Sequence, residues 1–414
     1  MQTNLADWIK DTPEGQEADS ILRKCVHCGF CTATCPTYQL LGDELDGPRG
    51  RIYLMKQVFE GSEVTAKTRL HLDRCLTCRA CETTCPSGVQ YGRLVDIGRK
   101  VVEERVPRTI AENATRKAIA TFLPQTQLVG AAVRLGQMFR PLVPESLAGK
   151  IPTAISKPGD WPAPRHVRRM LVLAGCVQPA LDPAINASAA RVLDRLGISL
   201  VEAPGAGCCG ALRFHLNYQE HGLDDMRRLI DAWWPLVEAG AEAIVMTASG
   251  CGATVKEYGH LLAHDPAYAA KAERIGELTH DVAEIIAAEQ SKLDALVAQA
   301  APISEERKRM AFHPPCTLQH GLKIRGVTEK IITSAGWQLV PVPDAHLCCG
   351  SAGTYSILQP ELSRQLKKNK LAALQSGGPA AITSSNIGCL SHLAPGTEIP
   401  MKHWIVALDE RLAG

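Results

Sequence analysis

The chain has 414 residues, 45% hydrophobic and 21% charged, and its 45 Lys and Arg against 43 Asp and Glu leave a formal net charge of +2. This length predicts two or three domains, and the balanced charge argues against a nucleic-acid partner, which would require a concentrated basic face. The first ten residues contain Asp7 and no apolar core, and no apolar run approaches the length of a membrane span. We therefore expect a cytosolic protein.

The most unusual feature of the composition is its 16 cysteines. In a secreted chain they would suggest disulfides, but this sequence shows no export signal and its cysteine spacings are short and repeated. In a reducing compartment such spacings indicate metal or redox chemistry.

Residues 1–107 are predicted to form an α-helical domain that two cysteine runs interrupt. The runs are Cys25, Cys28, Cys31 and Cys35, followed by Pro36, and Cys75, Cys78, Cys81 and Cys85, followed by Pro86. Both match the bacterial pattern for [4Fe–4S] clusters in full, including the proline. Between them, residues 51–59 have apolar side chains at helical spacing after a Gly-Pro-Arg-Gly turn, which predicts a helix.

The spacing also predicts which cysteines share a cluster, because in this pattern the fourth cysteine of each run binds the other cluster. We expect one [4Fe–4S] cluster on Cys25, Cys28, Cys31 and Cys85, and a second on Cys35, Cys75, Cys78 and Cys81. Structural zinc is the alternative, since CxxC pairs also make zinc sites. Zinc would not require a third cysteine at fixed spacing or the Cys-Pro, so two complete copies favour iron–sulfur.

Residues 108–167 form a proline-punctuated linker with one or two short helices. Within it, residues 126–147 could form a short amphipathic helix that lies on a membrane surface. A helix packed on a partner subunit would have the same pattern.

After the linker the sequence is duplicated, as residues 168–300 and 301–414. Each copy begins with an apolar strand ending in cysteine (residues 170–176 and 310–316), and 31 residues separate that cysteine from a Cys-Cys-Gly. Each copy also has a strand before the Cys-Cys-Gly (residues 198–204 and 337–343) and a later strand running into Gly-Cys (residues 243–251 and 380–389). Alternating strands and helices predict a parallel sheet covered by helices.

The repeat cysteines follow the carboxyl ends of these strands, the edge where open α/β sheets bind ligands. They are Cys176, Cys208, Cys209 and Cys251 in the first copy and Cys316, Cys348, Cys349 and Cys389 in the second. Buried structural cysteines are the alternative, but the matching positions favour a metal or redox role.

The sequence also contains a match to the dinucleotide-binding fingerprint, which we do not interpret as a nicotinamide site. Residues 205–210 satisfy G-x-G-x-x-G after a strand, but the second copy keeps only the Cys-Cys-Gly. The duplication preserves the thiol pair and not the glycines, so we do not expect nicotinamide binding. The fold class is therefore multidomain α and α/β: an N-terminal helical di-cluster ferredoxin domain followed by two α/β Cys-Cys-Gly repeats.

This combination of motifs closely resembles the family of iron–sulfur subunits of bacterial glycolate oxidase (glycolate dehydrogenase), over essentially the whole chain. The resemblance is carried by CVHCGFCTATCPTYQLLGDELDGPRGRIYL at residues 25–54, CLTCRACETTCPSGVQY at residues 75–91, SGCGATVKEYG at residues 249–259 and HLCCGSAGTY at residues 346–355. The same architecture occurs in subunits for lactate utilisation, for anaerobic glycerol-3-phosphate dehydrogenase and for heterodisulfide reductase, which remain alternatives.

The resemblance implies an electron-transfer subunit that is not catalytic alone. In that family, flavin-containing subunits oxidise glycolate to glyoxylate, and this subunit passes the electrons singly to a membrane quinone. It implies a heterotrimer associated peripherally with the cytoplasmic membrane. In heterodisulfide reductases the repeat ends in CxxC, but here Ala248 and Asn386 replace the first cysteine of that pair. A five-thiolate site therefore cannot form within one repeat, and further iron–sulfur at the repeats stays open.

Overall fold

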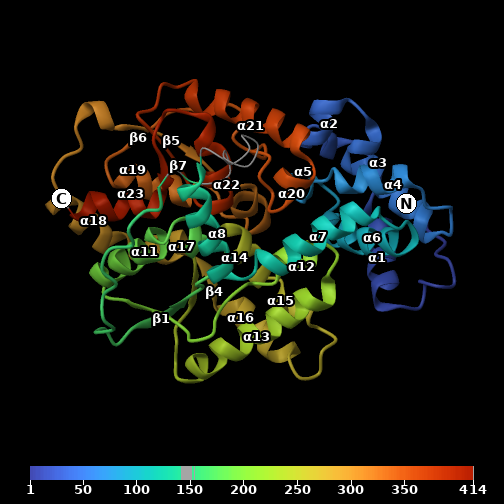
Figure 1. Ribbon diagram of the computed structural model, residues 1–414, viewed down its shortest axis with the longest axis horizontal. Helices are drawn as coiled ribbons and strands as arrows, with labels where there is room; N and C mark the ends of the chain where they lie inside the picture. The colour runs from blue at the N-terminus through green and yellow to red at the C-terminus, as the bar shows by residue number, and fades with distance from the viewer. Residues whose placement is uncertain (141–151, 153, 414) are drawn as a thin grey trace. The chain divides into compact units, whose positions relative to one another are not determined.

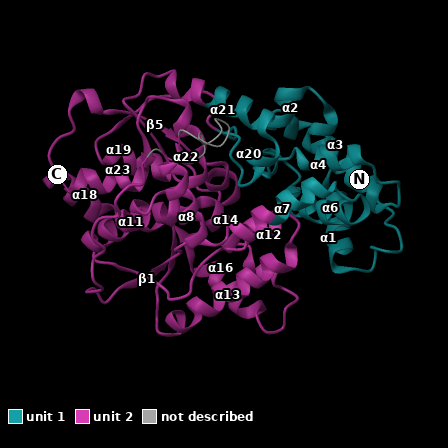
Figure 2. Cartoon of the chain, in the orientation of Figure 1, with its two compact units in different colours: residues 1–117, 346–370 teal, residues 118–345, 371–414 magenta. Residues whose placement is uncertain are grey.

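The computed structural model describes residues 1–140, 152 and 154–413. It divides into two compact units, one of residues 1–117 and 346–370 and the other of residues 118–345 and 371–414, shown in different colours in Figure 2. This division differs from the predicted domains because residues 346–370 of the second repeat group with residues 1–117. The predicted domain boundaries stay a prediction. Each unit is described by itself.

The first unit is helical, as predicted. Its main helices are α1 (Pro13–Lys24), α2 (Pro36–Leu41), α3 (Pro48–Phe59), α4 (Ala66–Asp73), α5 (Ala80–Thr84), α6 (Tyr91–Arg105), most of α7 (Ile110–Phe122), α20 (Tyr355–Leu358) and the start of α21 (Pro360–Gln375). Proline occupies the first turn of α1, α2 and α3, where its missing N–H has no helical partner to lose. The predicted helix at residues 51–59 therefore begins earlier, at Pro48.

The core of this unit brings the cysteine runs onto tightly packed helices. Side chains of α1, α3 and α6 form the core together with Cys25, Cys75 and Cys81. At the crossing of α3 and α6, a Cβ added to Gly98 would clash with the side chain of Met55, so any larger residue there requires Met55 to shift. The cluster-binding segments are thus held by helices in close contact.

The second unit contains two four-stranded parallel sheets, in the orders β2-β1-β3-β4 and β6-β5-β7-β8. The strands are β1 (Arg169–Val172), β2 (Ser199–Glu202), β3 (Ile244–Met246), β4 (Thr279–Asp281), β5 (Arg309–His313), β6 (Gln338–Leu339), β7 (Ala381–Ser384) and β8 (Met401–His403). The mixed α and α/β fold class is confirmed. The sequence predicted three strands per copy and missed β4 and β8, each only three residues long.

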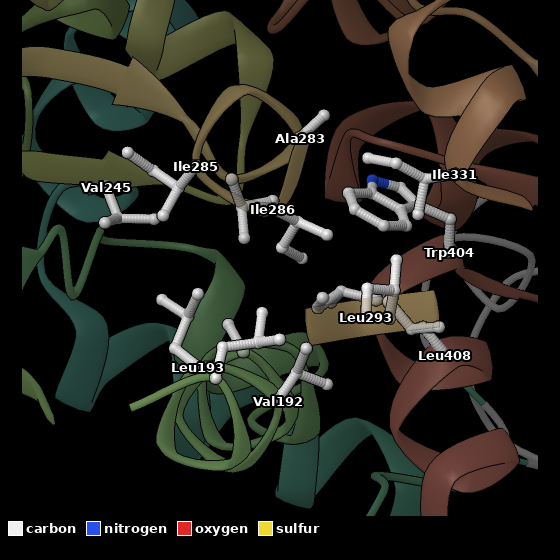
Figure 3. Close-up of a cluster of buried hydrophobic side chains, with 14 of the residues drawn as sticks. Val192, Leu193, Val245, Ala283, Ile285, Ile286, Leu293, Ile331, Trp404 and Leu408 are labelled. Carbon is white, nitrogen blue, oxygen red and sulfur yellow. The ribbon is translucent and has the colours of Figure 1, made fainter. Parts of the chain in front are cut away.

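Helices cover these sheets (Figure 1). They include α11 (Ala184–Arg195), α13 (Gln219–Glu238), α17 (Val282–Ala288), α18 (Gln290–Gln299), α19 (Val327–Ser334) and α23 (Trp404–Ala413). One hydrophobic core joins both repeats: Figure 3 shows Leu193 and Ile286 of the first copy in the same cluster as Ile331 and Trp404 of the second.

Helix α8 (Thr126–Met138) forms in the region where an amphipathic helix was expected. Val129 and Val133 bury one face of it against Ala180, so part of its apolar surface is already used within the second unit. Residues 141–147 of the expected stretch lie outside the described residues. Among the helices that the structure describes, none is long and apolar enough to cross a membrane.

Candidate metal centres

The two N-terminal cysteine runs share an unusual backbone. His27 and Gly29 have positive φ angles of 56° and 86°, and Thr77 and Arg79 at the equivalent positions have 54° and 61°. Left-handed residues on either side of the second cysteine fold each run into a tight turn. Such a turn lets three cysteines face one centre, and Arg79 adopts it despite its Cβ.

The first cavity in this unit opens to solvent and has a volume of about 430 Å³, counting its mouth. Four cysteines that line it are Cys25, Cys28, Cys31 and Cys85. Cys25 and Cys85 cap the ends of α1 and α5, while Cys28 is exposed. The other walls are largely apolar and include Val26, Phe30, Ile52 and Val89.

The second cavity, of about 310 Å³ counting its mouth, is lined by Cys35, Cys75, Cys78 and Cys81. Cys35 caps the start of α2, directly before Pro36, and so lies on the opposite side of its run from the first cavity. The structure therefore brings each predicted set of four cysteines to one cavity, although Cys81 of the second set also lines the first cavity, and the assignment of ligands to clusters stays a prediction.

Three residues line both cavities: Pro48, Cys81 and Tyr91. Tyr91 is buried, and its hydroxyl lies 3.6 Å from the sulfur of Cys75. The two cavities are thus neighbours with one aromatic side chain in the shared wall.

Whether these thiols fit a metal cluster can be tested by their protonation. Burial raises the pKa of Cys31 to about 11 and also raises the pKa of Cys25 and Cys81. Cysteine ligands of a metal must be deprotonated. A buried thiolate is stable only beside a positive charge, and bound iron would supply that charge. The four thiols predicted for each cluster, all buried or half-buried except Cys28, are therefore a donor set suited to an iron–sulfur cluster and poorly suited to remaining metal-free.

A buried charge network borders the second cavity. Arg51 of α3 is 1% exposed and Asp46 is fully buried. The Arg51 guanidinium donates to the His71 carbonyl over 2.7 Å and to the Thr37 hydroxyl over 3.1 Å, and lies 3.4 Å from the Asp46 carboxylate. Thr37 in turn lies 3.3 Å from the sulfur of Cys35.

The first repeat gathers its four cysteines, all within the second unit. Hydrogen bonds link the side chain of Cys208 to those of Cys176 and Cys209, and Cys209 to Cys251. Hydrogen bonds from Cys176 and Cys209 lower the pKa of Cys208, which favours the thiolate form at this member of the set. Cys251 lies in the first turn of α14 (Ser249–Val255) and not on the strand itself.

The glycine of each Cys-Cys-Gly has a steric reason. Gly210 and Gly350 have φ angles of 82° and 89°, and a Cβ added there would lie 2.5 Å from the Gly222 carbonyl oxygen and 2.7 Å from that of Ser363. The close approach of the following long helix fixes both positions as glycine.

In the second repeat, Cys316 and Cys389 belong to the second unit, and the buried pair Cys348 and Cys349 belongs to the first. Asn386, which occupies a position where related repeats have cysteine, donates a hydrogen bond from its amide to the Cys389 sulfur over 3.7 Å. None of the sixteen cysteines, all of which lie within the described residues, forms a disulfide in this structure.

The sequence reasoning missed the residues between the ligands. Arg51 and Tyr91 line the second cavity and Asp46 pairs with Arg51, yet none of the three lies within a cysteine run. Arg51 falls on the apolar face of a predicted helix. This conflict with the helical pattern was the one feature of the sequence that could have indicated a functional role for Arg51.

Comparisons with known proteins agree with this geometry. Residues 21–89 match the family model of the 4Fe-4S dicluster domain, and residues 170–256 and 310–394 match that of the cysteine-rich domain. The chain is 54% identical over 412 residues to the glycolate oxidase iron-sulfur subunit of Escherichia coli (strain K12), covering 100% of this chain and 99% of that protein. It is 30% identical over 406 residues to the probable glycolate oxidase iron-sulfur subunit of Bacillus subtilis (strain 168), covering 91% and 89%.

More distant relatives share part of the chain. Lactate utilization protein A of Bacillus licheniformis is 26% identical over 222 residues, which cover 53% of this chain and 87% of that protein. This partial match fits the lactate alternative only loosely.

Proposed function

Because this chain belongs to the family of glycolate oxidase iron–sulfur subunits, we propose that it carries electrons from glycolate, through flavin-containing partner subunits, to a membrane quinone-type acceptor. The observation that carries the proposal is the pair of adjacent cavities that the eight cysteines of the two runs line, with Cys81 in the wall of both. Oxidation of a 2-hydroxy acid releases two electrons together, and a flavin is the cofactor that separates them. The role of this subunit begins after that step.

The proposed ligand sets follow the two cavities. Cys25, Cys28, Cys31 and Cys85 would hold one [4Fe–4S] cluster, and Cys35, Cys75, Cys78 and Cys81 the other. When bound, each cluster would accept and donate one electron at a time. Tyr91, which is buried, lines both cavities and would lie in the wall shared by the two clusters.

The partners we propose are the flavin-containing subunits of a heterotrimer. The exposed Cys28 and its neighbours Val26 and Phe30, which are 67% and 61% exposed, lie at the mouth of the first cavity and support docking of an electron donor there. Electron transfer requires close approach, and an apolar rim around an exposed ligand suits a protein partner.

Peripheral membrane association is also a proposal. On α8 and just after it, Leu128, Leu135, Met138 and Phe139 are exposed, beside the exposed Arg134. Apolar and basic side chains on one short helix suit an anionic bilayer surface. Flotation of the complex with anionic vesicles tests this: Leu135→Glu should weaken binding, and high salt should release the protein without detergent.

The first repeat supports a second role for its thiols. Four hydrogen-bonded cysteines that include a thiolate could bind further iron or act in thiol–disulfide chemistry, and we propose the metal role for Cys176, Cys208, Cys209 and Cys251. For Cys316, Cys348, Cys349 and Cys389 we propose the same role by the correspondence of the repeats.

Stopped-flow absorbance on the assembled three-subunit complex tests the main proposal. Glycolate should reduce the flavin first and the clusters afterwards. Cys31→Ser or Cys81→Ser should abolish onward transfer and leave flavin reduction intact in complexes that still assemble. Glycolate turnover by this subunit alone would contradict the proposal.

A further inference from the structure

Arg51 places a permanent positive charge beside the second cavity. It comes from α3, lines the cavity together with Cys35, Cys75, Cys78 and Cys81, and is 1% exposed. An arginine is almost never fully buried unless it is paired, because removing its charge from water is costly. Because Arg51 lies on an otherwise apolar helix face, the cost of burying its charge must be offset by the groups around it.

The partners of Arg51 fix its orientation but do not cancel its charge. Two of its three hydrogen-bond acceptors are neutral, the His71 carbonyl and the Thr37 hydroxyl, while the third is the Asp46 carboxylate at 3.4 Å. The nearer cationic partner of Asp46 is Arg74, at 2.8 Å. Two guanidinium groups thus share one buried carboxylate, which leaves an excess of positive charge beside the cavity.

The first cavity has no equivalent among its described lining residues. Arg49 lines it, but the Arg49 side chain is 36% exposed and pairs with Glu44 over 2.6 Å. Water screens an exposed charge strongly, whereas a charge in the low-dielectric interior acts at nearly full strength. The two cavities therefore differ in the electrostatics that a bound cluster would experience.

The buried positive charge of Arg51 would change the electron affinity of a cluster bound in the second cavity. A cluster held by four thiolates carries negative charge, and burial disfavours the addition of another electron. A fixed neighbouring cation offsets that penalty, and net charge and hydrogen bonding are what tune such potentials. The Thr37 hydroxyl accepts from Arg51, donates to the Asp46 backbone carbonyl over 2.8 Å and lies 3.3 Å from the Cys35 sulfur, so Arg51 also holds the polar group that contacts this ligand.

We propose that Arg51 is a potential-setting residue for the cluster in the second cavity, whose midpoint potential it raises, and that Asp46 limits the rise. The inference rests on the proposed cluster assignment. It deepens that assignment by making the second cluster an acceptor whose potential depends on one buried side chain. Arg51 touches no substrate and acts only through its charge and its hold on Thr37.

The test is a redox titration of the full chain, reconstituted with iron and sulfide and followed by electron paramagnetic resonance. Cys28→Ser and Cys78→Ser assign the two reduced signals to the two cavities. Arg51→Gln should shift the second cluster's midpoint to more negative values, Arg51→Lys should leave it near wild type, and Asp46→Asn should shift it to more positive values. Arg49→Gln is the matched control and should move neither midpoint appreciably.

Opposite shifts from Arg51→Gln and Asp46→Asn are the decisive result, because a merely structural disturbance would not change sign with the charge removed. Unchanged midpoints at full iron content, or shifts of the same sign, would overturn the inference and leave the cluster assignment standing. If Arg51→Gln fails to fold, the inference is still tested by the other two variants: Arg51→Lys should leave the second midpoint near wild type, and Asp46→Asn should raise it. Zinc without acid-labile sulfide in the wild type would instead overturn the assignment itself, and the inference with it.

Discussion

The hydroxyl of Tyr91 donates a hydrogen bond to the sulfur of Cys75 over 3.6 Å, and both residues are buried. Because Tyr91 also lines the first cavity, one side chain connects the two candidate cluster sites. Hydrogen bonds to ligand sulfurs stabilise the extra negative charge of a reduced cluster.

Tyr91→Phe removes this hydrogen bond and keeps the ring. We expect full iron content and a more negative midpoint potential for the second cluster, with the first cluster little changed. Redox titration measures both, and Tyr53→Phe, at an exposed position on α3, is the matched control. An unchanged second midpoint would contradict a tuning role for the hydroxyl.

Replacing Cys85 tests the crossed ligand sets. Cys85 follows Cys81 in the sequence but lines the first cavity together with Cys25, Cys28 and Cys31. Cys85→Ser should therefore damage the first cluster and spare the second, and Cys35→Ser should do the reverse. Spectra of the two reduced clusters decide, and loss of the sequence-adjacent cluster in either variant would show that the crossing is wrong.

Iron analysis tests the repeat thiols. Two cubanes account for about eight irons, and any further iron would come from the repeats. If the first repeat binds metal, the double variant Cys208→Ala/Cys209→Ala should lose the excess above eight and keep both N-terminal cluster signals. A count of about eight that the double variant does not lower would refute the metal role and leave thiol chemistry for these residues.

Asp281 predicts a pH dependence of stability. It caps α17, where its carboxylate accepts the Ala283 N–H over 2.9 Å, and burial raises its pKa to about 7. The folded state therefore binds a proton more tightly than the unfolded state. This contribution stabilises the fold at low pH and is lost as pH rises from about 4 to about 7.

Asp281→Asn keeps a capping oxygen and removes the charge. We expect the variant to exceed wild type in free energy of unfolding by roughly 2–4 kcal/mol at pH 8, and to differ little near pH 4. Urea unfolding at both pH values measures this, with Asp294→Asn, at an exposed position, as the control. An equal effect at both pH values would rule out titration as the cause.

Much of this molecule follows from local sequence. The cysteine spacing predicted two sets of four thiols, and the members of each set line one cavity, with Cys81 lining both. The equal spacing of 31 residues inside the two copies revealed the duplicated sheets. Strands β4 and β8 were missed because three residues carry no readable periodicity.

The surroundings of the cavities were not predictable in the same way. The contact of Arg51 with Asp46 depends on how α3 packs against the preceding turn at Glu44–Asp46. The contact of Tyr91 with Cys75 spans sixteen residues and depends on how α6 packs against the segment that follows α4. A buried arginine also contradicts the helical pattern that predicted α3. Such exceptions are resolved only by tertiary contacts.

The joint core of the two repeats limits how this duplication can change. Trp404 and Leu408 of the second copy fill the same interior as Val192 and Leu193 of the first, as Figure 3 shows. A substitution on one side alters the fit that the other side requires, so neither half accumulates changes independently. The two copies therefore behave as one packing unit. Exchanging one half for that of a relative would preserve the core only if the facing side chains of the other half were exchanged with it.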